Sequence, residues 1–361
     1  MKQKSVLLTG LIAAQLLLII LLGAYVYEKW GTQFALSIGS LRRENFQFGQ
    51  SAALKNFFEP AAVPGGRVEV PKPYPGWLKS RPTYTINSEG MNSGKEYAVQ
   101  KPSKTFRIIT LGDSWTFGFL VNTADNYSSQ LEKQLNASAA CGGTHFEVLN
   151  LGVPSYDIAY SAERLRVRGE KYSPDLVVWL IHDDDFTEPN EFIVSRMEQY
   201  KSEIEKSGET PNMVLKVSNG GSKYEDVQGT KPFFSGSEMN IKIAARMKAA
   251  EAVRSEWGVN GMMRYGISQL NRFRSTYAGP LVIFMYPYLG DTREVHTAVQ
   301  KELQDFVSQQ KNASLLSIPE DLSKIDGLLP DFHPNEKGHA IIAKDLFTYV
   351  TQHHLVPCKA L

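Results

Sequence analysis

Short apolar runs alternate with amphipathic stretches of helical period through most of the chain after residue 105. Two of these runs, 176–181 and 281–286, are apolar at every position, which is typical of strands buried on both faces of a parallel sheet. The pattern predicts strands at 106–111, 146–151, 176–181, 281–286 and 314–318, and helices at 126–136, 157–170, 294–310 and 337–352. This alternation indicates an α/β fold in which a parallel sheet lies between two layers of helices.

The segment of about 187–278 interrupts the alternation. Residues 218–236 within it are rich in Gly and Ser, and we interpret them as a loop. We therefore expect an insertion that lies over one end of the sheet. A lid or substrate-binding element and a surface decoration are both consistent with this pattern.

The N-terminus carries a separate signal. Lys2 and Lys4 precede the segment 6–27, which contains no charged residue. A helix of that length would measure about 33 Å, enough to cross a bilayer core of about 30 Å. A secretory signal has a shorter apolar core and a small-residue cleavage site, so we expect an uncleaved transmembrane anchor within residues 1–30. The lysines favour a cytoplasmic N-terminus, with the body on the periplasmic or extracellular side.

Proline and glycine punctuate the region after the anchor. Six prolines lie between residues 59 and 82, which is typical of a linker or a strap laid over the surface. Turn-forming residues at 87–90 indicate a hairpin within 83–97. We assign residues 31–100 to a linker and N-terminal extension, and residues 101–361 to the α/β domain with its insertion.

Composition and charge exclude several classes of protein. The chain has 39 Lys+Arg against 38 Asp+Glu, a formal charge of +1, whereas proteins that bind nucleic acid phosphates carry a basic excess. We expect no nucleic-acid partner. Two cysteines, Cys141 and Cys358, are too few for a disulfide-built scaffold or a Cys-rich metal site. In an oxidising compartment they are able to pair, and the sequence leaves open whether they do.

Candidate chemistry lies where the first two predicted strands end. Gly112-Asp113-Ser114 follows the first strand, and Asn150-Leu151-Gly152 follows the second. A serine at a sharp turn from strand to helix is exposed, and amides of the following helix can stabilise a developing oxyanion. Gly152 would let a backbone N–H approach a substrate closely. A polar turn with a helix cap and an ordinary turn glycine would explain the same residues.

A third polar segment, 331–339, lies between the last predicted strand and the last helix. Because the carboxyl ends of parallel strands share one edge, His333 could take the proton of Ser114 and return it to a leaving group, although a loop or helix-capping histidine would explain the same residue. Asp331 would orient the imidazole ring and stabilise the imidazolium. His339 belongs to the start of the helix and is the weaker candidate.

Together these segments resemble the sequence blocks of the SGNH hydrolase superfamily, also called the GDSL lipase/esterase family. The resemblance covers about residues 106–186 and 281–350. Gly112-Asp113-Ser114 with Gly118 looks like the first block, Asn150-Leu151-Gly152 like the second, and 331–339 like the last.

The resemblance implies a flavodoxin-like three-layer α/β/α sandwich. It also implies Ser114 as nucleophile and His333 as general base, with the backbone amides of Ser114 and Gly152 in the oxyanion hole. Members of the family hydrolyse or transfer O-acyl groups on lipids, sugars and small esters. They require no metal, and we expect no cofactor.

The chain departs from the family pattern in two places. Where the family has an oxyanion-hole Asn after the third strand, this chain has Asp184, with Asp183 as the alternative position. An ionised carboxylate cannot donate, so Asp184 would have to be protonated, point away or leave the activity low. The family's triad Asp, three residues before the His, is Pro330 here. Asp331 is our candidate acid, with Asp326 further away and a Ser–His dyad as the fallback.

We expect a membrane-anchored, serine-dependent esterase or O-acyltransferase that acts on an ester-bearing lipid or carbohydrate of the cell envelope. A catalytically inactive SGNH-fold module for binding or assembly is the alternative, and the carboxylate of Asp184 is its main support. A metal-dependent phosphoesterase built on His182 and Asp183–Asp185 is disfavoured, because successive strand residues point to opposite faces.

Overall fold

The computed structural model describes residues 46–48, 58–60, 67–69, 78, 80–208, 211–218, 221–226, 237–286, 293–317, 322 and 324–359. The expected anchor at residues 6–27 lies outside this part of the chain, so the anchor and its orientation stay predictions. Within the described residues, no helix combines the length and apolar character needed to cross a membrane.

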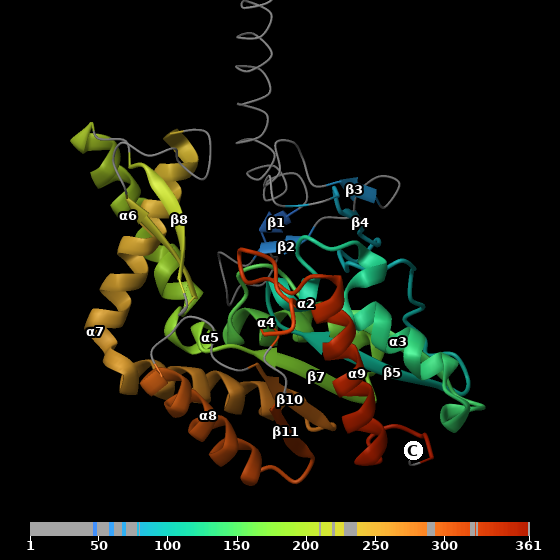
Figure 1. Ribbon diagram of the computed structural model, residues 1–361. Helices are drawn as coiled ribbons and strands as arrows, with labels where there is room; N and C mark the ends of the chain where they lie inside the picture. Colours follow the sequence, from blue (N-terminus) through green and yellow to red (C-terminus); the bar gives the residue numbers. More distant parts are fainter. Residues whose placement is uncertain are drawn as a thin grey trace, which may run out of the picture.

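A five-stranded parallel sheet forms the centre of the domain (Figure 1). Its strands lie in the order β11-β10-β7-β5-β6, and every neighbouring pair is parallel. The strands are β5 Thr105–Leu111, β6 His145–Asn150, β7 Leu176–Ile181, β10 Leu281–Met285 and β11 Ala313–Ser317. They are the five strands that the apolar runs predict, and their ends differ from the predicted ends by no more than one residue.

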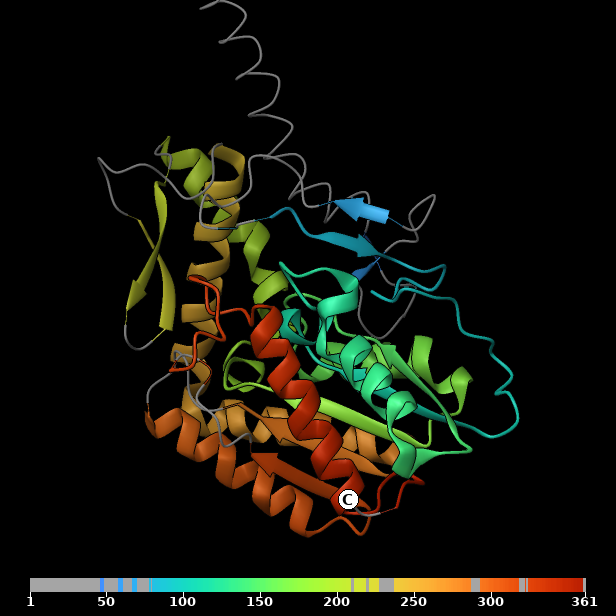
Figure 2. The same cartoon turned by 45° about the vertical axis from the view of Figure 1, so that its right-hand side comes forward.

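Alternate residues of each strand face opposite layers of helices. In β7, Val177, Trp179 and Ile181 belong to one core, whereas Val178 and Leu180 belong to the other. The first core is covered by α4 (Ile158–Arg164), α7 (Ser237–Thr276) and α8 (Arg293–Ser308), and the second by α3 (Tyr127–Ala137) and α9 (Glu336–Gln352). Figure 2 shows α3 and α9 over one face of the sheet and α8 on the other. The predicted three-layer α/β architecture is confirmed.

The strand order changes direction at β5. The chain places β6 on one side of β5 and then crosses to β7 on the other side. Ligands of open α/β sheets bind beyond the carboxyl ends of the strands at such a reversal. The short helix α2 (Ser114–Phe117) begins directly after β5, so Ser114 lies where this topology favours a site.

The predicted insertion forms a helical arm. The short helix α5 (Asp184–Thr187) follows β7, and α6 (Asn190–Ser207) then packs along α7. Figure 1 shows α6 and part of α7 extending away from the sheet. The helix α7 bends at Gly258, whose φ of 60° and ψ of 173° are not helical.

The interpretation of residues 218–236 as a loop is wrong for part of that segment. The strands β8 (Met213–Ser218) and β9 (Gly221–Asp226) form an antiparallel hairpin. The sequence between the two strands is Asn219-Gly220, a pair that favours tight hairpin turns, and this signal outweighs the Gly and Ser content. Residues 227–236 lie outside the described part of the chain.

The N-terminal extension contributes short strand pairs and a turn that contacts the domain. The strands are β1 Phe46–Phe48, β2 Phe58–Pro60, β3 Arg67–Glu69 and β4 Thr83–Thr85, paired as β1-β2 and β3-β4. An antiparallel bridge joins Ile86 to Asn92 across the predicted turn at 87–90, so this hairpin is confirmed. The side-chain amide of Asn92 donates to the Phe117 carbonyl at 2.7 Å, which ties the hairpin to α2.

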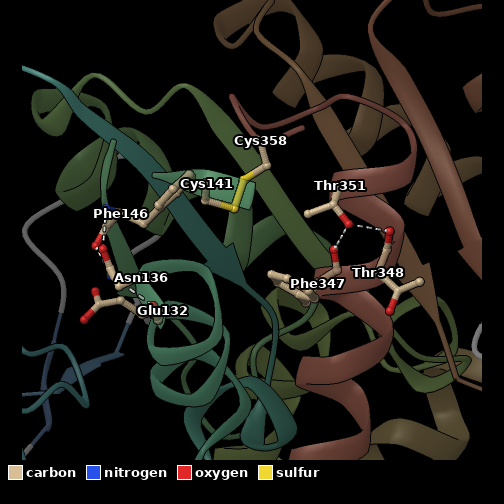
Figure 3. The surroundings of a disulfide bond; sticks show 8 residues. All are labelled: Glu132, Asn136, Cys141, Phe146, Phe347, Thr348, Thr351 and Cys358. Carbon is tan, nitrogen blue, oxygen red and sulfur yellow. Dashed lines mark hydrogen bonds between the residues drawn. A yellow bond between two sulfur atoms is a disulfide. The ribbon is translucent and has the colours of Figure 1, made fainter. Parts of the chain in front are cut away.

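Cys141 and Cys358 form a disulfide, which answers the question that the sequence leaves open (Figure 3). The bond joins the segment before β6 to the tail after α9 across 217 positions. Both cysteines are buried in the core shared by α3 and α9. Because Cys141 lies just before β6 begins, the disulfide is near the amino ends of the strands, at the edge opposite Ser114.

Candidate active site

Ser114 lies in the turn after β5, and the backbone of this turn requires glycine at position 112. Gly112 has a φ of 141°, and a Cβ atom there would lie 2.3 Å from Oγ1 of Thr116. Asp113 then caps α2, because its Oδ1 accepts the backbone N–H of Trp115 at 2.9 Å. The backbone N–H of Ser114 has no acceptor within the described residues. The turn therefore exposes both a hydroxyl and a free amide.

A tight loop before α9 presents His333. The backbone N–H of Leu329 donates to the His333 carbonyl at 2.7 Å, and that of Phe332 donates to the Leu329 carbonyl at 2.9 Å. Asn335 caps α9 by accepting the N–H of Gly338 at 3.0 Å. These bonds fix the loop at the carboxyl edge of the sheet, the same edge that carries Ser114.

The structure brings Ser114, His333 and Asp331 together. Nε2 of His333 lies 2.9 Å from Oγ of Ser114, although the two residues are 219 positions apart in the chain. Nδ1 of the same ring lies 3.0 Å from Oδ2 of Asp331. The ring nitrogen and the carboxylate form an ion-pair contact but no hydrogen bond, so hydroxyl, imidazole and carboxylate lie in the order of a Ser-His-Asp triad with its second hydrogen bond unformed.

The charges around His333 favour its role as a base. Burial lowers the pKa of His333, but the adjacent carboxylate of Asp331 and the charge of Asp113 more than offset this effect. The pKa therefore lies above its ordinary value of 6.5. A carboxylate that raises the basicity of the ring also stabilises the imidazolium that forms when the ring takes a proton.

Ser114 has a second acceptor. Its Oγ lies 3.3 Å from Oδ2 of Asp113, compared with 2.9 Å from Nε2 of His333. A hydroxyl carries one proton, and the shorter contact favours the imidazole as its acceptor. Asp113 therefore caps the helix and faces the nucleophile, a double position that the sequence motif does not reveal.

Gly152 lies so close to α2 that there is no room for a side chain at this position. A Cβ atom at this position would be 2.3 Å from the backbone nitrogen of Phe117 in α2. The backbone N–H of Gly152 donates to Oδ1 of Asn150 at 2.9 Å, so this amide already has a protein acceptor. Its role as an oxyanion donor stays a prediction, whereas its role in close packing against α2 is evident.

Ser155, which sequence reasoning does not single out, lies three residues further along the same loop. It is exposed, and its φ of 67° is in the left-handed region. Its backbone N–H has no acceptor within the part of the chain that the structure describes. Serine does not favour positive φ, but Pro154 and Ser155 are the central residues of a turn that the N–H of Tyr156 closes by donating to the Val153 carbonyl at 3.1 Å, and the proline is the signal in the sequence for this turn.

The three consecutive aspartates after β7 have different surroundings. Asp184 is exposed as the first residue of α5, whereas Asp183 and Asp185 are buried. Asp183 faces Nδ1 of His296 on α8 at 3.1 Å, and Asp185 accepts the backbone N–H of His182 at 2.7 Å. Burial raises the pKa of Asp185, and the neighbouring charges of Asp184 and Asp113 raise it further. A place for Asp184 in the oxyanion hole stays a prediction.

Of the other histidines of the region, His339 is buried and His182 is partly exposed. Nε2 of His182 lies 4.0 Å from Oδ1 of Asp113, and its ring packs edge-on against Trp115. Burial lowers the pKa of His182 against the opposing charge of Asp113. Nδ1 of His339 accepts the backbone N–H of Tyr127 at 3.3 Å, which makes it a structural residue. No group of three or more His, Cys, Asp or Glu in the described residues is arranged to hold a metal ion.

No family model and no curated protein matches this chain. Its structure is similar, at low sequence identity, to solved structures that include two esterases and TesA. A family two carbohydrate esterase from Clostridium thermocellum in complex with cellohexaose gives a TM-score of 0.40 at 13% identity, covering 72% of this chain and 67% of that chain. TesA gives a TM-score of 0.39 at 13% sequence identity, and the match covers 69% of this chain and 99% of TesA. The psychrotrophic esterase EstA from Pseudoalteromonas sp. gives a TM-score of 0.40 at 11% sequence identity, and the match covers 69% of this chain and 98% of EstA. Since these TM-scores are below 0.5, the function of this chain has to be inferred from its own geometry.

Proposed function

We propose that the protein is a serine-dependent esterase or O-acyltransferase. The observation that carries the proposal is the contact of 2.9 Å between Oγ of Ser114 and Nε2 of His333, with the carboxylate of Asp331 behind the ring. A nucleophile bonded to a base that is oriented by a third group is the arrangement that activates a serine hydroxyl.

The geometry supports a two-step acyl transfer. Nε2 of His333 takes the hydroxyl proton of Ser114 as Oγ bonds to the ester carbonyl carbon, and the carbonyl oxygen becomes an oxyanion. The tetrahedral intermediate collapses, and the leaving alkoxide takes the proton from His333. Water or a sugar hydroxyl then attacks the acyl-serine and gives its proton to His333, and collapse of this second intermediate returns the proton to Ser114. The products are a free acid or a new ester.

The oxyanion needs amide donors beside Ser114. The backbone N–H of Ser114 itself is one, because it has no acceptor within the described residues. The loop of residues 152–155 supplies the second: Gly152 is the position that the sequence indicates, and Ser155 carries an exposed amide. Preorganised donors of this kind each contribute about 10²–10³-fold to the rate in other acyl-transfer enzymes.

The proposed location is outside the cytoplasmic membrane, with an N-terminal anchor and an ester-bearing glycan or lipid of the envelope as substrate. The uncharged segment at residues 6–27 supports the anchor. The disulfide between Cys141 and Cys358 supports an oxidising compartment, because disulfides persist there and are rare in the cytosol. Protease added outside intact spheroplasts should digest the body of the protein, and protection would contradict this location.

A second candidate function is an inactive binding or assembly module of the envelope. The occupied amide of Gly152 favours it, because a bonded amide is lost to the oxyanion hole, and a carboxylate of Asp184 in the position that the sequence suggests would weaken that hole further. It predicts capture of a glycan or protein partner that is undiminished in a Ser114→Ala variant, with no acyl turnover.

A fluorophosphonate probe tests the main proposal without knowledge of the substrate. We expect the full-length protein in detergent to be labelled at Ser114, and Ser114→Ala to abolish labelling. The matched control is Ser195→Ala, which removes an exposed serine hydroxyl on α6 and should leave labelling intact. Absence of labelling in the folded wild-type protein would argue against an activated serine.

A further inference from the structure

Asn190 connects the helical arm to the edge of the sheet that carries Ser114. It is the first residue of α6 and is 5% exposed. Its backbone N–H donates to Oδ2 of Asp157 at 2.6 Å, while Oδ1 of Asp157 accepts the N–H of Tyr160 and caps α4. One carboxylate thus fixes the starts of both α4 and α6. The side chain of Asn190 is then free to reach the loop before α4.

The orientation of the Asn190 amide follows from its two partners. Its Oδ1 accepts from Nη1 of Arg246 on α7 at 2.8 Å, and its Nδ2 donates to the Ser155 carbonyl at 2.6 Å. A guanidinium can only donate and a carbonyl can only accept, so the oxygen faces Arg246 and the nitrogen faces Ser155. Arg246 is itself held at 3.0 Å from Oε2 of Glu188. The arm therefore determines which side of Asn190 meets the loop.

The bond from Asn190 acts on a residue in an unfavourable conformation. Ser155 has a φ of 67°, which residues with a Cβ rarely adopt and which persists only where the surroundings impose it. The start of the same loop is fixed to the nucleophile turn, because the N–H of Val153 donates to the Gly112 carbonyl at 3.1 Å. Pro154 has no N–H, and the N–H of Tyr156 donates to the Val153 carbonyl at 3.1 Å, so within residues 152–156 the N–H of Ser155 is the one without an acceptor among the described residues.

We propose that Asn190, oriented by Arg246, is a positioning residue that holds Ser155 in its left-handed conformation. The backbone N–H of Ser155 then faces the oxyanion formed at Ser114. The inference rests on the proposed acyl-transfer function and deepens it. It gives the insertion a role, because the arm supplies the bond that completes the oxyanion site. It also accounts for how a residue with a Cβ is held at positive φ.

A double-mutant cycle tests this role. We expect Asn190→Ala to lower the second-order rate constant of fluorophosphonate labelling by about 10- to 100-fold, which is less than the loss of a complete donor. With an activated aryl acetate, kcat should fall and KM should stay constant, because the oxyanion exists only in the transition state. In a Ser155→Gly background the same Asn190→Ala change should cost about threefold or less, because glycine adopts positive φ without help.

Two control variants separate positioning from folding. Asn136→Ala removes a similar bridge, between the Asn136 side chain and the backbone of Phe146, near the opposite edge of the sheet (Figure 3). Arg196→Met removes an arm arginine that pairs with Glu256 at 2.6 Å. Both should label at the wild-type rate at a temperature where thermal melts show every variant to be folded, whereas Arg246→Met should label more slowly.

The outcomes are distinguishable. An Asn190→Ala protein that labels at the wild-type rate would overturn the inference and leave the proposed function intact. A loss that is equally large in the Ser155→Gly background would also overturn it, because the role of Asn190 would then be structural. A folded wild-type protein that neither labels nor hydrolyses the ester would remove the proposed function and this inference with it.

Discussion

The carboxylate of Asp331 lies 3.0 Å from Nδ1 of His333, although a single residue separates the two in the chain. That residue, Phe332, has a φ of 68°, in the left-handed region that aromatic residues rarely adopt. The backbone N–H of His333 also donates to Oδ1 of Asp331 at 3.3 Å. The loop is therefore turned back on itself, and an acid two positions before the histidine reaches the ring.

The first prediction concerns the pH dependence of the activity. His333 acts as a base only when neutral, so activity should fall as the pH drops through its pKa. Asp331 holds that pKa above 6.5, against the lowering effect of burial. Asp331→Asn should lower kcat by about 10³- to 10⁴-fold and move the acid limb of the kcat/KM profile to lower pH. Residual hydrolysis of an aryl ester, measured between pH 5 and 9, checks both effects.

Asp326→Asn is the matched control for this experiment. It removes a carboxylate from the same loop, and the side chain of Asp326 makes no described contact with His333. Its pH profile should coincide with that of the wild-type protein. An acid limb that stays in place in Asp331→Asn would show that another group sets the pKa of His333.

The sequence predicts the sheet well because its signal is local. Runs such as 176–181 are apolar at every position, and burial on both faces leaves little room for another interpretation. The meeting of Ser114 with His333 was predictable for a related reason, since parallel strands bring their carboxyl ends to one edge. The positions of Ser114 and His333 after strands of one parallel sheet are therefore enough to predict that the two side chains lie close together.

What could not be predicted depends on side chains from elements far apart in the chain. The bond from Asn190 to Ser155 joins the insertion to the loop after β6, and no local pattern encodes it. The amide of Gly152 is similar, because its acceptor on Asn150 becomes visible only when the loop is folded. In both cases the chemistry depends on backbone direction, which hydrophobic periodicity does not report.

The second prediction tests the close approach of Gly152 to α2. In Gly152→Ala, the added Cβ would lie 2.3 Å from the backbone nitrogen of Phe117, so α2 or the loop must move. We expect a loss of about 1–3 kcal/mol in the free energy of unfolding, typical of overpacking, and slower labelling of Ser114. Gly94→Ala is the control, because a Cβ there meets nothing within 4 Å. Equal stability and labelling rates for the two variants would contradict this assignment.

The third prediction concerns the disulfide. Cys141→Ser with Cys358→Ser should lower the free energy of unfolding by about 2–5 kcal/mol, because the bond closes a loop of 217 positions in the unfolded chain. Labelling of Ser114 at 25 °C should be unchanged, since the cysteines lie at the opposite edge of the sheet. Thermal melts with and without reductant provide the measurement. Reduction should lower the Tm of the wild-type protein and leave the double variant unaffected, and a wild-type Tm insensitive to reductant would contradict the prediction.

The last prediction concerns acid stability. Burial, together with the charge of His333, lowers the pKa of His339 from 6.5 to about 3. Between these values the unfolded chain binds a proton that the folded protein excludes, so the free energy of unfolding should decrease on acidification by about 1.4 kcal/mol per pH unit from this group. His339→Asn keeps an acceptor for the Tyr127 amide and removes the titration, so its stability should decline less steeply from pH 6.5 to 4.5.

Denaturant unfolding of both proteins across this range gives the two slopes. The exposed His145 provides the control, because His145→Asn should keep the wild-type slope. The absolute stability of His339→Asn at neutral pH should be lower, since a smaller side chain leaves space in a fully buried site. The slope alone therefore reports the titration of His339, and parallel curves for His339→Asn and the wild-type protein would show that the proton excluded on folding belongs to another residue.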